Sequence, residues 1–160
     1  MIKSILIVCI GNICRCPMAL GLFARKLPGV QLNSAGIDAV VGAPADPLAI
    51  DLMRLRNIDI SAHRGEQLRA WQCASADLIL VMDLPQKRFI EKYYPTTRGK
   101  LFRLGEYGRF DIFDPHQGGR SDFERCLALI EQGVDDWTAR IAASGSPPPK
   151  ATHELVQITQ

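Results

Sequence analysis

The sequence predicts a single α/β domain whose four-stranded parallel sheet carries helices on both faces. Strand-like and helix-like segments alternate along the chain, which favours parallel strands joined by crossover helices. The first and third strand candidates are continuous apolar runs, and such runs indicate strands that are covered on both sides. The 160 residues are 47% apolar with a formal charge of +2, which suits one core and argues against nucleic-acid binding. This pattern is typical of Rossmann- and flavodoxin-like folds.

The first strand and helix are marked by an apolar run and two prolines. Residues 5–8, ILIV, are rich in β-branched side chains and predict a buried strand. A helix is expected over residues 17–27, because Pro17 suits its first turn and Pro28 would stop it. The N-terminal apolar run is too short for a secretory leader, so we expect a cytoplasmic chain with reduced cysteines.

The middle of the chain continues the alternation. Residues 30–36 predict a second strand that ends in a turn. Asp46, followed by Pro47, provides an N-cap and a first-turn proline for a helix that extends to about residue 55. The remaining expected elements of this part are a strand at 77–83, a helix at 84–93 and a short strand at 100–104.

The last helix has the clearest signal. Ser121 and Glu124 fit a capping box, which places Ser121 at the N-cap. An apolar stripe with steps of four and three residues follows it, formed by Phe123, Leu127, Ile130, Val134, Trp137 and Ile141. The domain is therefore expected to span residues 1–143. The Pro- and Ser-rich residues 144–160 are expected to be a disordered tail.

The loop after the first strand is the strongest functional signal. Its sequence, CIGNICRCP at residues 9–17, lies where open parallel sheets bind ligands. Gly11 and Asn12 tolerate the left-handed backbone that makes successive N–H groups converge on an anion. Arg15 adds a planar cation that matches phosphate oxygens, and this positive environment would lower the pKa of Cys9. The loop therefore predicts phosphoryl transfer through a phosphocysteine formed on Cys9.

A metal site and simple burial account less well for the three loop cysteines. Cys9, Cys14 and Cys16 have C-x4-C-x-C spacing, which matches neither zinc nor iron–sulfur patterns and lacks a nearby fourth ligand. Burial as small apolar side chains would account for one cysteine but not for the polar residues around it. We therefore expect neither a metal nor a cofactor. Cys73 and Cys126 fall in helical stretches, where we expect them to serve packing.

The loop resembles the C-x-G-N-x-C-R-S-P signature of the low-molecular-weight protein tyrosine phosphatases. Other segments resemble that family in the same order, from residue 5 to about 142. They are NSAG with Ser34, SAH with His63, Met82-Asp83 after the third strand, and Asp114-Pro115 before the last helix. The short chain resembles the bacterial branch, which acts on tyrosine autokinases tied to exopolysaccharide export. The expected partner is therefore a phosphotyrosine protein, with no nucleic acid and no membrane insertion; the oligomeric state is open.

The resemblance implies roles for individual residues. Cys9 is the expected nucleophile, Arg15 binds the phosphoryl oxygens, and Asp114 is the general acid, with Asp111 as the alternative. Asp46 also precedes a proline, but helical periodicity follows it at once, so we expect it to be a cap. The expected phosphate-binding residues are Ile10, Gly11, Asn12, Ile13, Cys14, Arg15 and Cys16. The expected supporting residues are Asn12, Ser34 and His63 around the loop, Cys14 as a redox partner of Cys9, and Val40 and His116 as cleft walls.

Several departures from the family pattern leave alternatives open. Cys16 stands where the family usually has Ser or Thr, so we expect slower breakdown of the phosphocysteine. His116 and Gln117 replace the usual aromatic pair. One alternative is a pseudophosphatase that binds phosphotyrosine or phosphate without hydrolysing it. An arsenate reductase is less favoured, because the segment after the third strand lacks the two further cysteines that it would need.

Overall fold

The computed structural model describes residues 1–144 and contains one parallel sheet of four strands in the order β2-β1-β3-β4. The strands are β1 Ser4–Cys9, β2 Gln31–Gly36, β3 Leu78–Val81 and β4 Leu101–Arg103. The helices are α1 Arg15–Lys26, α2 Pro47–Arg54, α3 Ala70–Ser75, α4 Leu84–Tyr93 and α5 Arg120–Ala143, with a 3-10 turn η1 at Pro95–Thr97. The predicted fold class, a single α/β domain, is confirmed.

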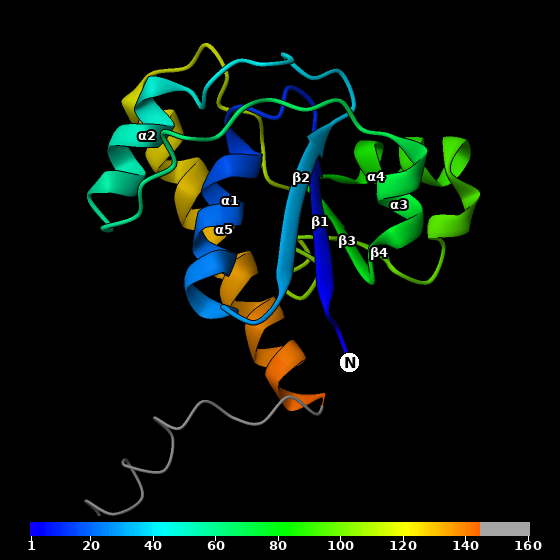
Figure 1. Cartoon of the computed structure of the whole chain (residues 1–160). Coiled ribbons are helices and arrows are strands. Elements are labelled where there is room, and N and C mark those ends of the chain that lie inside the picture. Colours follow the sequence, from blue (N-terminus) through cyan, green and yellow to red (C-terminus); the bar gives the residue numbers. More distant parts are fainter. Residues whose placement is uncertain (145–160) are drawn as a thin grey trace, which may run out of the picture.

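Helices cover both faces of the sheet. Along β1, Ile5 and Ile7 point into a core shared with α1, α2 and α5, whereas Leu6 and Val8 point into a second core shared with α3 and α4. Figure 1 shows these two groups of helices on opposite sides of the strands. The alternation follows from the period of two of a β-strand, and it explains why the run ILIV is apolar without interruption.

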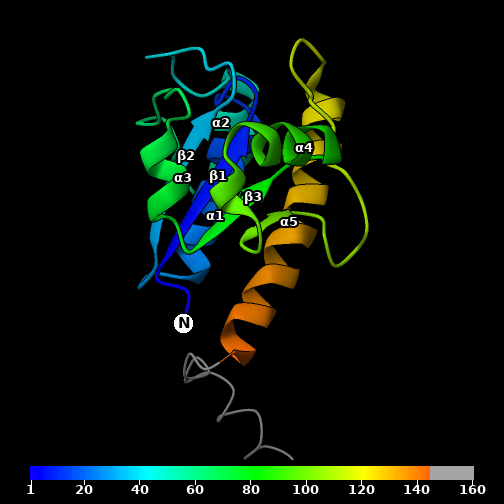
Figure 2. The ribbon, with the colours of Figure 1, turned by 90° about the vertical axis from the view of Figure 1, so that its right-hand side faces the viewer.

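Helix α5 crosses one side of the molecule, as Figure 2 shows. All six residues of its predicted apolar stripe are buried, as expected. The predicted start was wrong, however, because the helix begins at Arg120 with Gly119 as N-cap. Asp122, not Glu124, occupies the third helical position, and its carboxylate accepts from the Gly119 N–H at 3.2 Å. The capping interaction therefore lies two residues earlier than Ser121 and Glu124 suggested.

Other element boundaries differ modestly from the sequence-based prediction. Helix α1 begins at Arg15, so Pro17 is its third residue. A backbone N–H at this position would have no acceptor within the helix, so a proline is tolerated there. Helix α3 was not predicted as a separate element, because its six residues are too few to show periodicity. The predicted disordered tail, apart from Ser144, lies outside the described residues.

The carboxyl ends of the strands form the edge where ligands are expected. Cys9 at the end of β1 pairs with Gly36 at the end of β2, and Val8 pairs with Val81 of β3. Figures 1 and 2 place the loop after β2 and the loop before α5 at the end of the molecule opposite the N-terminus. Among the described residues, no helix has the length and apolar character needed to cross a membrane.

Candidate active site

The loop that is expected to bind phosphate, residues 9–16 and here called the phosphate loop, connects β1 to the first turn of α1 and is hydrogen-bonded to the segment after β2. Ile37, Asp38 and Val40 donate their backbone N–H groups to the carbonyl oxygens of residues 9, 10 and 11 at 2.9–3.0 Å. Gly36 makes this approach possible, since a Cβ there would lie 2.4 Å from the Ile10 oxygen. The left-handed residue of the loop is Asn12, with φ 63°, and not Gly11.

Cys9 lies at the base of the loop, where its surroundings favour the thiolate. Burial alone would raise the pKa of this thiol, but three groups that stabilise negative charge outweigh it. They are the Cys16 side chain, the Arg15 guanidinium, and the backbone N–H groups of Asn12 and Cys16. The pKa of Cys9 is consequently lowered from the ordinary 9.0, so the residue is prepared to act as a nucleophile.

The remaining backbone donors of the loop are available to an anion. The N–H groups of Ile10, Gly11, Ile13 and Cys14 donate to no acceptor within residues 1–144. These residues directly precede α1, whose N-terminus carries a partial positive charge. Free N–H groups beside a helix N-terminus form an anion site without any further cation. The segment that was predicted to bind phosphate therefore has the donors to do so.

Arg15 supplies the fixed positive charge of the site. Its side chain is buried, and Nη1 donates to the Ile112 carbonyl oxygen at 2.8 Å. The same nitrogen lies 3.7 Å from a carboxylate oxygen of Asp83, while Nη2 lies 3.6 Å from an oxygen of Asp114. The guanidinium is thus oriented by groups from two segments, the end of β3 and the loop before α5, and the carboxylate of Asp114 lies at its outer side.

Asn12 connects the loop to its supporting residues. Its Nδ2 donates to Ser34 Oγ at 3.0 Å, and its Oδ1 accepts from the Glu66 N–H at 2.9 Å. His63 Nε2 donates to the Asn12 carbonyl oxygen at 2.5 Å. Burial lowers the pKa of His63, although this hydrogen bond opposes the shift. The side chain and backbone of Asn12 are both held, which stabilises its left-handed conformation.

Removing one partner of this network should destabilise the domain. In Ser34→Ala, the Asn12 side-chain amide keeps a buried donor without an acceptor, so we expect a loss of about 1–3 kcal/mol in the free energy of unfolding. Urea denaturation followed by circular dichroism measures this loss. Ser121→Ala, at an exposed helix position, serves as the control and should change stability by less than about 0.5 kcal/mol. Equal stability of both variants would contradict the supporting role of Ser34.

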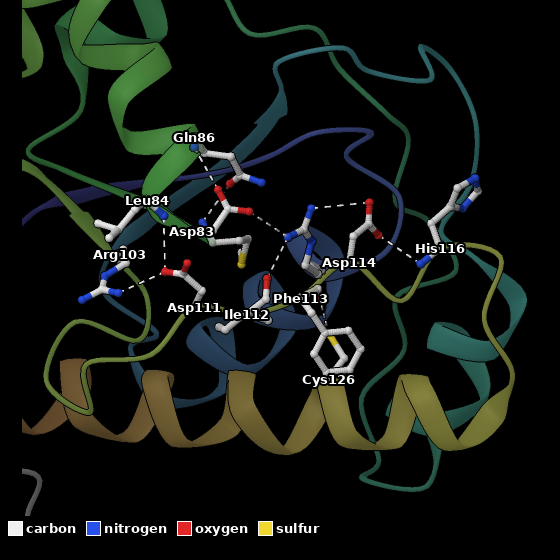
Figure 3. Close-up of polar contacts among 12 residues, drawn as sticks. Asp83, Leu84, Gln86, Arg103, Asp111, Ile112, Phe113, Asp114, His116 and Cys126 are labelled. Atoms are coloured by element: carbon white, nitrogen blue, oxygen red, sulfur yellow. Dashed lines mark hydrogen bonds and ion pairs between the residues drawn. The ribbon is translucent and has the colours of Figure 1, made fainter.

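The two aspartates of the loop before α5 have different surroundings. Asp114 is half-exposed beside Arg15, and its Oδ1 accepts from the His116 backbone N–H at 3.0 Å. Asp111 accepts from Arg103 Nη1 at 3.0 Å and from the Leu84 N–H at 3.3 Å. Figure 3 shows Asp111 turned toward Arg103 and Leu84, on the side away from Asp114. Of the two candidates for general acid, Asp114 is therefore the one beside the phosphate loop.

The site is a cleft of about 250 Å³ at the carboxyl ends of the strands. The predicted residues Val40, Asp114 and His116 form its walls around the loop, whereas Ser34, His63 and Cys16 lie behind its surface. Sequence reasoning missed Asp38 in the wall of the cleft. It also missed Asp83 and Ile112, which are the partners of Arg15. Asp38 and Asp83 follow β2 and β3 within two residues. Their position at the ligand-binding edge was the signal that could have identified them.

The other cysteines are buried and free, and they differ chemically from Cys9. Burial raises the pKa of Cys14 to about 12, and the carboxylates of Asp46 and Asp114 add to the effect. Burial also raises the pKa of Cys16, together with its hydrogen bond to Cys9. Cys14 as a redox partner of Cys9 stays a prediction; its thiol is protonated at neutral pH and would attack oxidised Cys9 slowly.

Cys126 of α5 contacts the loop that carries Asp114. It is fully buried, and its thiol donates to the Phe113 carbonyl oxygen at 3.5 Å, directly before Asp114. Figure 3 shows this cysteine beneath Phe113, on the helix that passes under the loop. Its burial and that of Cys73 in α3 agree with the packing roles expected from the sequence.

A cysteine with a lowered pKa, free backbone donors, a buried arginine and a carboxyl group in one cleft are the groups that a cysteine-dependent phosphatase needs. The sequence matches the family described as low molecular weight phosphotyrosine protein phosphatase over residues 4–146. The chain belongs to this family.

Two comparisons with known proteins agree with this assignment. The probable low molecular weight protein-tyrosine-phosphatase EpsP of Ralstonia nicotianae is 52% identical over 145 residues, which cover 91% of this chain and all of EpsP. The tyrosine phosphatase Wzb of Escherichia coli K30, solved with sulphate, is 33% identical with a TM-score of 0.85. That match covers 88% of this chain and 99% of Wzb.

A third comparison concerns a structure with a bound phosphonate. Wzb of Vibrio vulnificus in complex with benzylphosphonate is 32% identical with a TM-score of 0.84. The match covers 88% of this chain and 99% of that one. The similarity therefore extends over nearly all of the described residues.

Proposed function

We propose that this protein hydrolyses phosphotyrosine and other aryl phosphates through a phosphocysteine on Cys9. The observation that carries the proposal is the lowered pKa of Cys9 at the base of a loop with free N–H donors and Arg15. Binding of a phosphate anion alone would need no nucleophile there. The names of the relatives, EpsP and Wzb tyrosine phosphatases, support phosphotyrosine as the substrate class.

In the first step, Cys9 Sγ attacks phosphorus while Arg15 and the loop N–H groups bind the three equatorial oxygens. The bond to the aryl oxygen breaks, and Asp114 gives this oxygen its proton. In the second step, the deprotonated Asp114 accepts a proton from water as the water attacks the phosphorus. Phosphate leaves, and the thiolate of Cys9 is restored.

The substrate in the cell is proposed to be a bacterial tyrosine autokinase linked to exopolysaccharide production. This proposal rests on the resemblance of the chain to the bacterial branch and on its 52% identity with EpsP. The protein is proposed to act in the cytoplasm, where such a kinase domain and a reduced Cys9 would meet.

Burst kinetics on p-nitrophenyl phosphate test the proposal. With purified, reduced protein between about pH 5 and 7, we expect a burst of p-nitrophenol followed by slower turnover. Phosphotyrosine peptides should be hydrolysed and matched phosphoserine peptides should not. Saturable phosphate binding without burst or turnover would overturn the proposal in favour of a pseudophosphatase.

The Cys16 side chain should set the rate of the second step. Its one thiol hydrogen has three acceptors, the Cys9 thiolate and the carbonyl oxygens of Ile7 at 3.5 Å and Ala35 at 3.8 Å. A hydroxyl is a stronger donor than a thiol, so Cys16→Ser should stabilise the departing thiolate better. We expect steady-state turnover to rise about tenfold, about 1.4 kcal/mol, with little change in the burst rate. Cys73→Ser is the matched control, and unchanged turnover in Cys16→Ser would contradict this role.

A further inference from the structure

A second group of ligating side chains lies at the cleft, with two of its three members in the cleft lining. Cys14 is the N-cap of α1, Asp46 is the N-cap of α2, and His116 lies in the loop before α5. One sulfur, oxygen or nitrogen atom from each lies within 4.8 Å of the other two. The Asp46 N–H donates to the Ile13 carbonyl oxygen at 2.8 Å, which fixes α2 beside the phosphate loop. Three segments far apart in sequence therefore bring three different donor types together.

We propose that Cys14, Asp46 and His116 bind a transition-metal cation of the Zn²⁺ type, and that the bound ion inhibits the enzyme. A thiolate, an imidazole and a carboxylate form a typical zinc donor set, whereas Mg²⁺ and Ca²⁺ prefer oxygen ligands alone. The site is distinct from the Cys9, Cys14 and Cys16 set that the sequence argued against. It shares only Cys14 with that set and leaves the nucleophile free.

The donor atoms are available for such a site. Within residues 1–144, neither the ring nitrogens of His116 nor the sulfur of Cys14 makes a hydrogen bond, and the cap interaction of Asp46 with the Leu48 N–H uses Oδ1, leaving Oδ2. Ligands of a tetrahedral zinc ion at bond lengths of about 2.0–2.3 Å lie roughly 3.3–3.8 Å apart. His116 is exposed, so its side chain can adjust to close the site, whereas Cys14 is buried.

The charges at the site also favour a cation. The carboxylate of Asp46 belongs to the group, and that of Asp114 lines the same cleft. The guanidinium of Arg15 is already oriented toward Asp83, Asp114 and the Ile112 carbonyl oxygen. Binding replaces the thiol hydrogen by the metal, so Cys14–SH and Zn²⁺ give a Cys14–S–Zn bond and one released proton. The fourth position of the ion is left for water.

The inhibition rests on the proposed phosphatase activity, but the binding does not. Cys14 and His116 both line the cleft, so an ion between them occupies part of it. The ion also joins the phosphate loop to the segment that carries Asp114, two residues before His116. Substrate entry and the movement of this segment would both be restricted.

Zinc titration of the tag-free protein tests the site directly. With thiols reduced by a phosphine that is then removed, calorimetry should give one Zn²⁺ per chain and about one proton released, read from the dependence of heat on the buffer. Asp46→Asn and His116→Gln should each weaken binding at least tenfold. Asn at position 46 can still cap α2, so this loss would not reflect unfolding. Asp38→Asn removes a carboxylate from the cleft outside the site and should bind zinc like the parent.

The nucleophile provides the decisive comparison. Cys9→Ser should bind zinc with an affinity within about threefold of the parent. Loss of binding in Cys9→Ser, together with retained binding in His116→Gln, would place the ion on Cys9 and overturn the proposal. Absence of stoichiometric binding would overturn it as well. The proposed inhibition is tested by the rate of hydrolysis with and without Zn²⁺. Zn²⁺ should lower this rate at least tenfold in the parent and leave it nearly unchanged in Asp46→Asn. Binding without inhibition would overturn the proposed inhibition alone.

Discussion

Cys9→Ser is expected to abolish hydrolysis of p-nitrophenyl phosphate, with a loss on the order of 10⁴-fold or more in kcat. The surroundings of Cys9 stabilise a thiolate, and its pKa is lowered by the Cys16 thiol, Arg15 and two backbone N–H groups against the effect of burial. These groups cannot ionise a serine hydroxyl to a useful extent at neutral pH. The variant should therefore keep the anion site while losing the nucleophile.

Two measurements separate this loss from unfolding. Phosphate titration followed by calorimetry should give a Kd within about threefold of the parent, because the loop N–H groups and Arg15 remain. Cys73→Ala, which changes a buried cysteine of α3 far from the cleft, should retain activity. Turnover in Cys9→Ser within tenfold of the parent would contradict the phosphocysteine route.

The lowered pKa of Cys9 can be measured with the parent protein, using Cys9→Ser to subtract labelling at other cysteines. Because the folded-state pKa lies below 9.0, the thiolate persists at pH values where an ordinary thiol is protonated. The rate of iodoacetate labelling at Cys9 should therefore have its midpoint below pH 9, and bound phosphate should protect against labelling. Labelling of the parent that follows an ordinary thiol, with its midpoint near 9, would contradict the charge distribution of the loop.

Local sequence patterns account for most of the fold. The uninterrupted apolar run from Ile5 to Val8 indicates a strand that is buried on both faces. The helical period of the apolar residues in α5 indicates its buried stripe. The start of α5 could not be read in the same way, because Ser121 and Glu124 match the capping-box pattern whereas Gly119 and Asp122 do not. Only the position of Gly119 in the folded chain selects Asp122.

Local patterns also identified the phosphate loop, but not the groups that orient it. Asp83 and the Ile112 carbonyl oxygen reach Arg15 from segments about 70 and 100 residues away, so no spacing could reveal the contacts. The proximity of Asp46 to Cys14 is likewise a consequence of packing. Motif reasoning works best where all residues of a feature lie in one turn and one helix start, as in the loop of residues 9–16.

The choice of Asp114 over Asp111 as general acid depends on these long-range contacts. Both aspartates lie in one loop, and each accepts hydrogen bonds that fix its side chain. Asp111 is paired with Arg103 at 3.0 Å, an interaction that holds its carboxylate away from the cleft. Asp114 is half-exposed at the outer side of Arg15, where the aryl oxygen of a bound phosphate ester would lie.

Asp114→Asn should therefore lower kcat/KM by about 10²–10⁴-fold for phenyl phosphate, the range expected when a general acid is removed. The loss should be much smaller for p-nitrophenyl phosphate, because p-nitrophenolate leaves readily without a proton. Asp111→Asn is the matched control in the same loop and should stay within about threefold of the parent on both esters. A leaving-group dependence that appears in Asp111→Asn and not in Asp114→Asn would reverse the assignment. If the loss in Asp114→Asn were equal for both esters, Asp114 would act by orienting Arg15 and not by donating a proton.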